Sequence, residues 1–484
     1  MIKKIFKKHW FFFVFITIFF FILLFKLVFY AKPFYDWDES LYIKSGLEMF
    51  EKKYFFFPVW QGKIWFDKPP LIPFLYALVI KIFPFIAPEI STRIFTLLIG
   101  TFTLILIYFF YDKLIKNSLL TTLIIFLTAS RPIFLQRLQV VNLDIFLLLG
   151  WIGYVLFFQR FFLSLFFLII AVFSKSLIGF YPIFLMFFYY FYLFLTKEID
   201  IKKFKKNTIK LFTHFSILLT WFILMYIKYG YSFLKMHIIE SHFRRVTASI
   251  EFHFGERLFY FNLIKNEFGS YLLLALACII IFIWHFYKKK LSATQLFFSF
   301  YLFPWFIFLN LTKTKIFWYL LPAIPQFAFF SFFPFTFLKN KKLLLHLLIF
   351  IFFVFLFYQF FWQKNFWSTF YSEYDSNYYL AITAKKYCSQ IDILIDQKTR
   401  SDFKTLDQLN LLITTSRWWG NHPSIFYYFG KKVNLYFDEK NFLKNIDEYE
   451  CIVLEKNDLN NLNLKNFKLI KNFDSLFLYQ RQNQ

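Results

Sequence analysis

The sequence has few of the residues that soluble enzymes use to hold nucleotides and metals. Its 11 glycines are scattered through 484 residues, with no G-x-G-x-x-G and no P-loop pattern, so no glycine-rich nucleotide loop is present. There is also no H-E-x-x-H, no G-x-S-x-G and no paired C-x-x-C motif. These absences count strongly against ATP-driven transport and zinc proteolysis.

Cysteine is also scarce. The three cysteines do not have a metal-binding spacing. Cys278 lies in an apolar run and is interpreted as an inert core residue. Cys388 and Cys451 can form a disulfide only where the C-terminal part of the chain is exported, and the sequence does not decide whether they pair.

Acidic residues are also scarce. The chain has 29 Asp and Glu against 55 Lys and Arg, which gives a net charge of +26. Such a charge would suit nucleic acid, but the lysines cluster in short runs between apolar segments. Runs of this kind stay on the cytoplasmic side and contact anionic lipid head groups. We therefore predict membrane lipids, and no nucleic acid, as partners. The runs include Lys3, Lys4, Lys7 and Lys8, then Lys202, Lys203, Lys205 and Lys206, and then Lys288, Lys289 and Lys290.

Apolar residues are abundant. They make up 59% of the chain and include 83 phenylalanines, whereas globular chains contain about 45–50%. The sequence predicts an all-α polytopic membrane protein with about eleven transmembrane helices, located in the plasma (inner) membrane with its N-terminus cytoplasmic. A signal-anchor helix is expected at residues 10–30, followed by spans at residues 93–111, 119–133, 143–158, 161–174, 177–196, 211–229, 271–287, 293–311, 316–337 and 343–361.

Two domains are predicted. Residues 1–361 form a transmembrane catalytic domain with a first outer loop at residues 31–70 and a fourth outer loop at residues 230–270. Residues 71–85 are interpreted as an interfacial or re-entrant segment, because that choice places the basic runs inside. From residue 362 polar residues alternate with short β-rich runs, which predicts a small extracytoplasmic α/β domain over residues 362–484.

Charge gathers in the first outer loop, where Asp36, Asp38, Glu39, Asp67 and Lys68 lie between apolar segments. Placing charge at a membrane surface costs solvation energy, so such a cluster indicates a functional site. The alternative is a solvated loop whose charges have no function.

Two motifs in this loop support a resemblance. Asp-Glu-Ser-Leu-Tyr at residues 38–42 and Trp-Phe-Asp-Lys-Pro-Pro-Leu at residues 65–71 resemble the GT-C class of membrane glycosyltransferases. The similarity is greatest to the branch that contains the aminoarabinose lipid A transferases and, more distantly, the protein O-mannosyltransferases. Weaker matches follow at residues 137–144, 173–179, 241–253 and 314–325, so the resemblance covers residues 1–340 and leaves the C-terminal part unassigned.

The resemblance implies a GT-C-like fold. It also implies sugar transfer, with inversion, from a polyprenyl-phosphate donor to a lipid, glycan or protein hydroxyl. It makes Asp38 the general base. Glu39 either holds the acceptor, orients Asp38, or is simply an acid favoured at a helix start. Lys68, joined by Arg244 or Arg245, would bind the donor phosphate. The alternatives are a lysine that extends to the interface and arginines that bind lipid head groups.

Other residues have two interpretations each. Asp144 either caps a helix or, by the resemblance, orients the substrate or Lys68. Lys175 and Lys315 either extend to the interface or contact phosphate. Asp67 and His242 are candidate ligands for a divalent metal such as zinc, manganese or magnesium. The aminoarabinose enzymes have Glu in place of Asp67 and Glu-His in place of Ser241-His242. Because of these two differences, the resemblance indicates the class of reaction more strongly than it indicates the substrate or a bound metal.

A transporter or flippase of lipid-linked glycans is the rival interpretation. A flippase should carry charges deep inside several helices, or broken half-helices at matching positions in two repeats. Here the charges gather in outer loops, and no repeat is visible in the sequence. A third interpretation, a catalytically inactive scaffold, is also compatible with the sequence.

Overall fold

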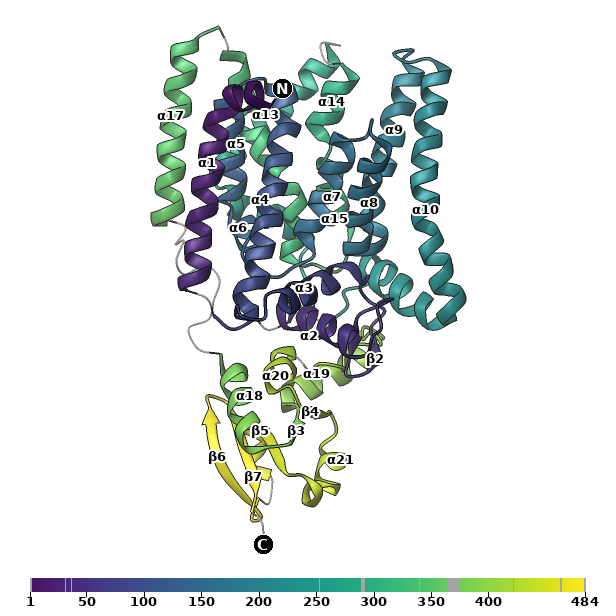
Figure 1. The fold of residues 1–484 in the computed structure, drawn as a ribbon, viewed down its shortest axis with the longest axis vertical. Helices are drawn as coiled ribbons and strands as arrows, with labels where there is room; N and C mark the ends of the chain where they lie inside the picture. The colour runs from purple at the N-terminus through teal and green to yellow at the C-terminus, as the bar shows by residue number, and fades with distance from the viewer. Residues whose placement is uncertain are drawn as a thin grey trace.

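The computed structural model describes residues 2–30, 32–35, 37–251, 253–288, 292–338, 340–363, 375–420, 422–461 and 464–482. A bundle of long helices forms one end of the molecule, and a smaller region with a β-sheet lies below it in Figure 1. The predicted fold class, an all-α polytopic membrane bundle with a small C-terminal α/β part, is confirmed. The bundle helices are α1 (Ile2–Phe29), α4 (Pro88–Ile115), α5 (Ser118–Ala129), α6 (Pro132–Arg137), α7 (Asp144–Leu156), α8 (Phe161–Lys175), η1 (Ser176–Phe180), α9 (Tyr181–Leu195), α10 (Ile201–Phe233), η2 (Leu234–Arg244), α11 (Arg245–Thr247), α12 (Phe259–Phe268), α13 (Tyr271–Tyr287), α14 (Ala293–Phe300), α15 (Phe303–Leu311), η3 (Phe317–Ala323), α16 (Ile324–Phe332), η4 (Phe333–Leu338), α17 (Lys342–Tyr358) and η5 (Gln359–Gln363).

The predicted count of about eleven spans is not confirmed. Among the described residues, six helices are long and apolar enough to cross a membrane, or up to eight if each of two bent helix pairs is one span. One of these pairs, α12 and α13, is bent by 113°. α5 and α7 lie where spans are predicted, but they have only 12 and 13 residues, and an upright span needs about 20.

The first outer loop folds against the end of the bundle. It contains α2 (Asp38–Glu51) and a hairpin of β1 (Val59–Trp60) and β2 (Lys63–Ile64), and α3 (Leu71–Ile82) follows it, in the segment predicted to be interfacial or re-entrant. The 12 residues of α3 are too few for an upright span. α2 packs on α3 through Gly46, where an added Cβ would lie 2.2 Å from the carbonyl oxygen of Pro73. This close approach fixes α2 across the mouth of the bundle, with Asp38 at its first residue (Figure 1).

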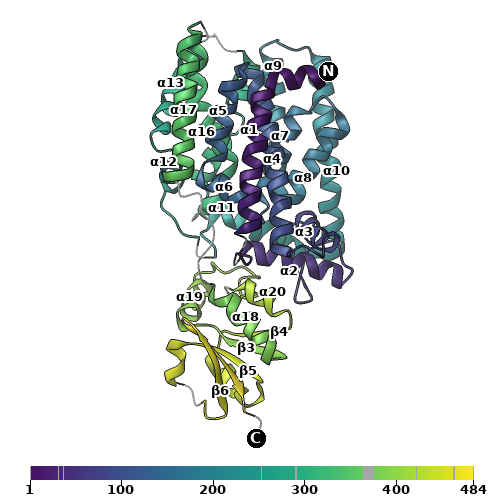
Figure 2. The same ribbon diagram turned by 60° about the vertical axis from the view of Figure 1, so that its left-hand side comes forward.

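The C-terminal part is a five-stranded mixed sheet with helices, within the residues that the structure describes. The strand order is β4-β3-β5-β7-β6, and β3 pairs in parallel with β4 and β5. A disulfide joins Cys388 to Cys451 and links the start of β3 to the start of β5. Figure 2 shows this region below the bundle from a second side. Its elements are α18 (Ser376–Tyr387), β3 (Gln390–Leu394), α19 (Gln397–Gln408), α20 (Pro423–Phe429), β4 (Lys432–Tyr436), α21 (Glu439–Lys444), η6 (Ile446–Glu448), β5 (Cys451–Glu455), η7 (Lys456–Asn461), β6 (Phe467–Phe473) and β7 (Leu476–Arg481).

Candidate active site

A cavity of about 610 Å³ lies where the first loop meets the C-terminal region. Its walls come from parts of the chain that are far apart in sequence. They are α2 and the first loop, residues 136–141, Lys175, residues 245–253, residues 316–319 and residues 403–422.

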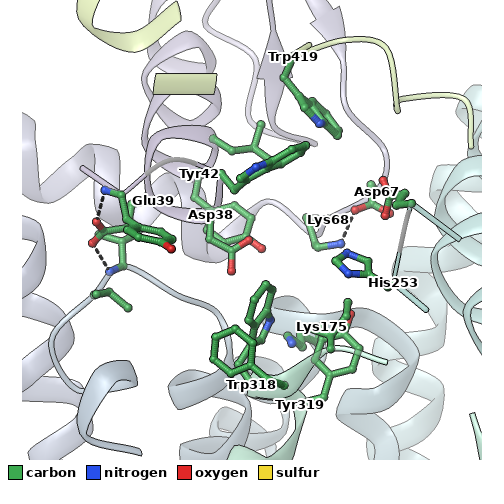
Figure 3. A pocket seen from close by; sticks show the side chains of 18 of the residues that line it. Asp38, Glu39, Tyr42, Asp67, Lys68, Lys175, His253, Trp318, Tyr319 and Trp419 are labelled. Carbon is green, nitrogen blue, oxygen red and sulfur yellow. Dashed lines mark hydrogen bonds and ion pairs between the residues drawn. The ribbon is translucent and has the colours of Figure 1, made fainter. Parts of the chain in front are cut away.

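Asp38 faces this cavity. Figure 3 shows its carboxylate between Trp419 on one side and Trp318 on the other. The side chain is 23% exposed, and its Oδ2 lies 3.5 Å from Nη1 of Arg137. The guanidinium of Arg137 lies over the Trp318 ring, 4.6 Å from its centre. Burial raises the pKa of Asp38 above its ordinary value, although the charge of Arg137 opposes the rise. Asp38 is therefore a partly solvated carboxylate with increased basicity.

Glu39 is adjacent in sequence but has a different environment. Its side chain is buried, and both oxygens accept hydrogen bonds from Arg93, at 3.0 and 2.6 Å. The backbone N–H groups of Tyr35 and Val141 also donate to it, at 2.6 and 2.8 Å. Four donors occupy the carboxylate, so this geometry favours a positioning role over contact with an acceptor. Glu39 holds the start of α2 against α4 and the segment before α7.

Asp144 pairs with Lys175 instead of Lys68. Its Oδ1 accepts a hydrogen bond of 2.6 Å from the Lys175 ammonium group. Asp144 is the first residue of α7, but Asn142 provides the cap, because its side-chain oxygen accepts from the N–H of Ile145. Asp144 itself is buried, and the cavity lining includes Lys175 but not Asp144 among the described residues. Asp144 therefore contacts a lysine that lines the cavity and is not itself among the described lining residues.

The packing of α7 against α8 explains why these two charges meet. A Cβ at Gly150 of α7 would lie 2.6 Å from the Cβ of Ala171 in α8, so the two helices approach as closely as only glycine permits. Asp144 begins α7 and Lys175 ends α8. Each charge suits the dipole of its helix end. The Lys175 ammonium group also lies 4.3 Å from the centre of the Tyr319 ring.

Asp67 and Lys68 form an ion pair beside the cavity. The ammonium group of Lys68 donates to Oδ2 of Asp67, and the hydroxyl of Ser241 donates to Oδ1. Burial alone would raise the pKa of Asp67, but the charges of Lys68 and Arg245 outweigh it and hold the pKa below its ordinary value. Arg245 lines the cavity and forms an ion pair of 2.6 Å with Glu251.

Two other predicted phosphate-binding residues point elsewhere. Arg244 donates to the backbone oxygens of Leu412 and Asn410 in the C-terminal region. Lys315 is buried and donates to the backbone oxygen of Leu309 at 3.1 Å. The cavity lining does not include either side chain among the described residues. Phosphate binding by Arg244 and Lys315 therefore stays a prediction. The hydrogen bonds that these two side chains make connect separate segments of the chain.

Metal binding by Asp67 and His242 stays a prediction. Both oxygens of Asp67 accept hydrogen bonds from Ser241 and Lys68. The Nε2 atom of His242 is buried without a hydrogen-bond partner among the described residues. Within the same residues, no group of three or more His, Cys, Asp or Glu side chains could hold a metal ion. A divalent ion needs more ligand atoms than this pair offers.

Sequence reasoning missed several residues of the cavity. Arg137 lines the cavity and Arg93 holds Glu39 beside it. An isolated arginine in an apolar stretch is a signal for a buried partner. Trp318 and Tyr319 lie in the matched segment at residues 314–325, where only a lysine is a predicted site residue, and Trp419 comes from the region that no motif assigned. Asp36, part of the predicted charge cluster, lies outside the described residues.

No family model matches the chain, and no curated protein sequence matches it either. Solved structures do match. ArnT from Cupriavidus metallidurans bound to undecaprenyl phosphate matches with a TM-score of 0.61 at 13% identity, over 96% of this chain and 97% of ArnT. The apo state of ArnT matches with a TM-score of 0.64 at 11% identity, over the same shares.

A second enzyme has a similar structure. The Archaeoglobus fulgidus oligosaccharyltransferase in its apo form matches with a TM-score of 0.56 at 12% identity, over 91% of this chain and 69% of that enzyme. At these identities the likeness concerns the fold. The chain therefore has the GT-C fold of ArnT and the oligosaccharyltransferase, as the two loop motifs predict.

Proposed function

We propose that this multi-pass membrane protein is a glycosyltransferase that moves a sugar from a polyprenyl-phosphate carrier to a hydroxyl of a lipid, glycan or protein. One observation carries the proposal. The Asp38 carboxylate and the ammonium groups of Lys68 and Lys175 line a single cavity at the mouth of the bundle. A carboxylate can accept a proton from the acceptor, and cations can stabilise a departing phosphate. The similar fold of ArnT, solved with undecaprenyl phosphate, supports this choice of donor.

The reaction is a single displacement. The acceptor hydroxyl gives its proton to Asp38 as its oxygen bonds to the anomeric carbon. The bond from that carbon to the phosphate oxygen breaks, and its electron pair stays on the polyprenyl phosphate. One displacement inverts the configuration at the anomeric carbon. The raised pKa of Asp38 suits this role, because a stronger base takes the proton more readily.

The basic residues have two different roles in this scheme: the two lysines stabilise the departing phosphate, and Arg137 acts on Asp38. Lys68 and Lys175 both line the cavity and each has its own acidic partner, Asp67 and Asp144. These partners fix the ammonium groups before a donor arrives, which reduces the reorganisation needed when charge develops on the phosphate. Arg137 pairs with Asp38, and its charge favours the ionised form of the carboxylate.

The disulfide supports an extracytoplasmic site. Disulfides such as Cys388–Cys451 persist in oxidising compartments, so we place the C-terminal region and the cavity outside the cytoplasm, at the plasma (inner) membrane. The N-terminus and the junction of α9 with α10, where Lys202 and Lys203 lie, are at the opposite end of the bundle in Figure 1. That placement agrees with the excess of lysine expected in cytoplasmic loops.

The test compares wild-type protein with two carboxylate variants in reconstituted membranes that contain polyprenyl-phosphate sugars, as donors, and lipids, glycans and proteins, as acceptors, extracted from the membranes in which the protein occurs. Release of sugar-free polyprenyl phosphate is followed by mass spectrometry. We expect Asp38→Asn to lower turnover by about a hundredfold to ten-thousandfold. The control is Asp112→Asn at the other end of the bundle, where turnover should be retained. Normal turnover in Asp38→Asn would remove this residue as the base, and absence of release by the wild type would contradict the proposed reaction.

A further inference from the structure

Three aromatic residues, Tyr42, Trp65 and Trp419, form one side of the cavity, which we call the aromatic wall. Tyr42 and Trp65 come from the first loop, and their ring centres lie 6.1 Å apart. Trp419 comes from the segment before α20, and its ring centre lies 5.8 Å from that of Trp65. All three residues line the cavity. Figure 3 shows Trp419 reaching toward the cavity from the side opposite Trp318 and Tyr319.

Two of these rings carry hydrogen-bond donors without acceptors. Trp65 is 1% exposed and Trp419 is 4% exposed, and neither indole nitrogen has a hydrogen-bond partner among the described residues. Buried tryptophan N–H groups usually find one. The neighbouring Trp60 follows that rule, since its N–H donates to the backbone oxygen of Trp418 at 3.0 Å. A ligand with hydroxyl groups would supply the missing acceptors.

The distance between these aromatic residues and Lys68 indicates which chemical class of ligand could lie between them. The ammonium group of Lys68 lies 6.0 Å from the centre of the Trp65 ring. A group bonded directly to a phosphate at Lys68 would therefore reach the aromatic wall. In the proposed donor that group is a sugar, which has hydroxyls for the indole donors and C–H faces for the aromatic rings.

We propose that Trp65 and Trp419, with Tyr42, form a subsite for a sugar ring. The inference rests on the proposed function and adds a role for the C-terminal region, which supplies Trp419. The sugar belongs either to the donor or to a glycan acceptor, and the experiment below separates these sources.

Contacts between the two regions hold Trp419 in place. The carboxylate of Glu240 accepts hydrogen bonds from the backbone N–H and the hydroxyl of Thr414, at 3.0 and 2.9 Å. Arg244 donates to the backbone oxygen of Leu412 at 3.0 Å. These bonds fix the segment that precedes Trp419 on the bundle. The subsite is therefore complete only when the C-terminal region is docked.

The test uses full-length protein purified in detergent from its own membranes. Mass spectrometry measures the ratio of glycosylated to sugar-free polyprenyl phosphate bound to each variant. A variant that merely unfolds loses both lipids, so the ratio reports contact with the sugar. We expect Trp419→Ala to lower the ratio on the order of tenfold and Trp419→Phe, which keeps a ring but loses the N–H, by about threefold. Trp418→Ala is the matched control, because the adjacent Trp418 side chain does not line the cavity among the described residues, and its ratio should not change.

Each outcome decides the proposal. A lowered ratio assigns the subsite to the donor's sugar. An unchanged ratio with loss of co-purifying glycan, and a raised KM for that glycan, assigns it to a glycan acceptor. Donor ratio and glycan both within about twofold of wild type would overturn the subsite while leaving the proposed reaction standing. A wild type that binds and releases no polyprenyl phosphate would overturn the proposed reaction and the subsite together.

Discussion

At the cavity end of the bundle, acidic and basic side chains are buried in pairs, whereas at the opposite end the basic side chains extend outward. Glu39 with Arg93 and Asp144 with Lys175 are all at most 11% exposed and lie 2.6 Å from their partners. At the other end, Lys8 is 62% exposed and 3.6 Å from Asp112. The bundle thus holds carboxylates in fixed, buried ion pairs at its cavity end. The exposed pair at the far end has no such constraint.

The largest effect on stability is expected from Glu39→Gln. The substitution removes the carboxylate that pairs with the buried Arg93 guanidinium, and breaking a buried ion pair costs about 3–5 kcal/mol. We expect a much lower apparent melting temperature in detergent. Asp38→Asn, one residue away but partly exposed, should have a melting temperature near that of wild type. Equal melting temperatures for the two variants would contradict the assignment of Glu39 as a structural residue. A double variant with Arg93→Gln should regain part of the loss, because no unpaired charge remains.

The second prediction concerns Lys175, whose ammonium group lines the cavity. Lys175→Met should lower kcat/KM on the order of a hundredfold, the usual effect of removing one group that stabilises developing charge. Asp144→Asn keeps the lysine and loses only its partner, so it should lower kcat/KM by about tenfold. The reverse order, with Asp144→Asn more harmful, would mean that the carboxylate itself contacts the substrate. Turnover of the donor measured for both variants at one pH distinguishes these cases.

The sequence predicts the first loop of the cavity, together with Lys175 and Arg245, but not the other residues that meet the loop there. Asp38 and Lys68 were found because charge is rare in an apolar chain and because their motifs resemble known ones. Arg137 lies 99 residues from Asp38, and no local pattern indicates that pairing. Trp419 was missed for the same reason, since it comes from the C-terminal region.

The number of spans is not confirmed for a related reason. Hydropathy measures how apolar a stretch is, but a bend within it depends on single residues. The predicted span at residues 293–311 is divided by a 50° bend between α14 and α15. α15 has a proline in its first turn, a residue that is tolerated there but not in a helix interior. Such a bend separates a run of apolar residues into two short helices without changing its composition.

A smaller effect is expected on the pH dependence of turnover. Because Asp38 acts as a base only when ionised, kcat/KM should fall as the pH drops through its pKa, which is raised above the ordinary value by burial. Arg137 lowers that pKa. Arg137→Met should therefore move this fall, the acidic limb of the curve of kcat/KM against pH, to higher pH. The measurement is kcat/KM against pH for the two proteins. A limb that stays in place, or moves to lower pH, would show that another group controls it. Arg417→Met, on the C-terminal region, is the control and should leave the limb unchanged.

The smallest effect is expected at the far end of the bundle. Lys8 and Asp112 form a pair with one largely exposed partner, and such pairs contribute at most about 1 kcal/mol because water screens the charges. Lys8→Met should therefore leave turnover unchanged and lower the melting temperature only slightly, and raising the salt concentration should reduce even that difference. A loss of stability equal to that of Glu39→Gln would remove the contrast between the two ends. It would mean that the end of the bundle far from the cavity is held by fixed charge pairs as firmly as the cavity end.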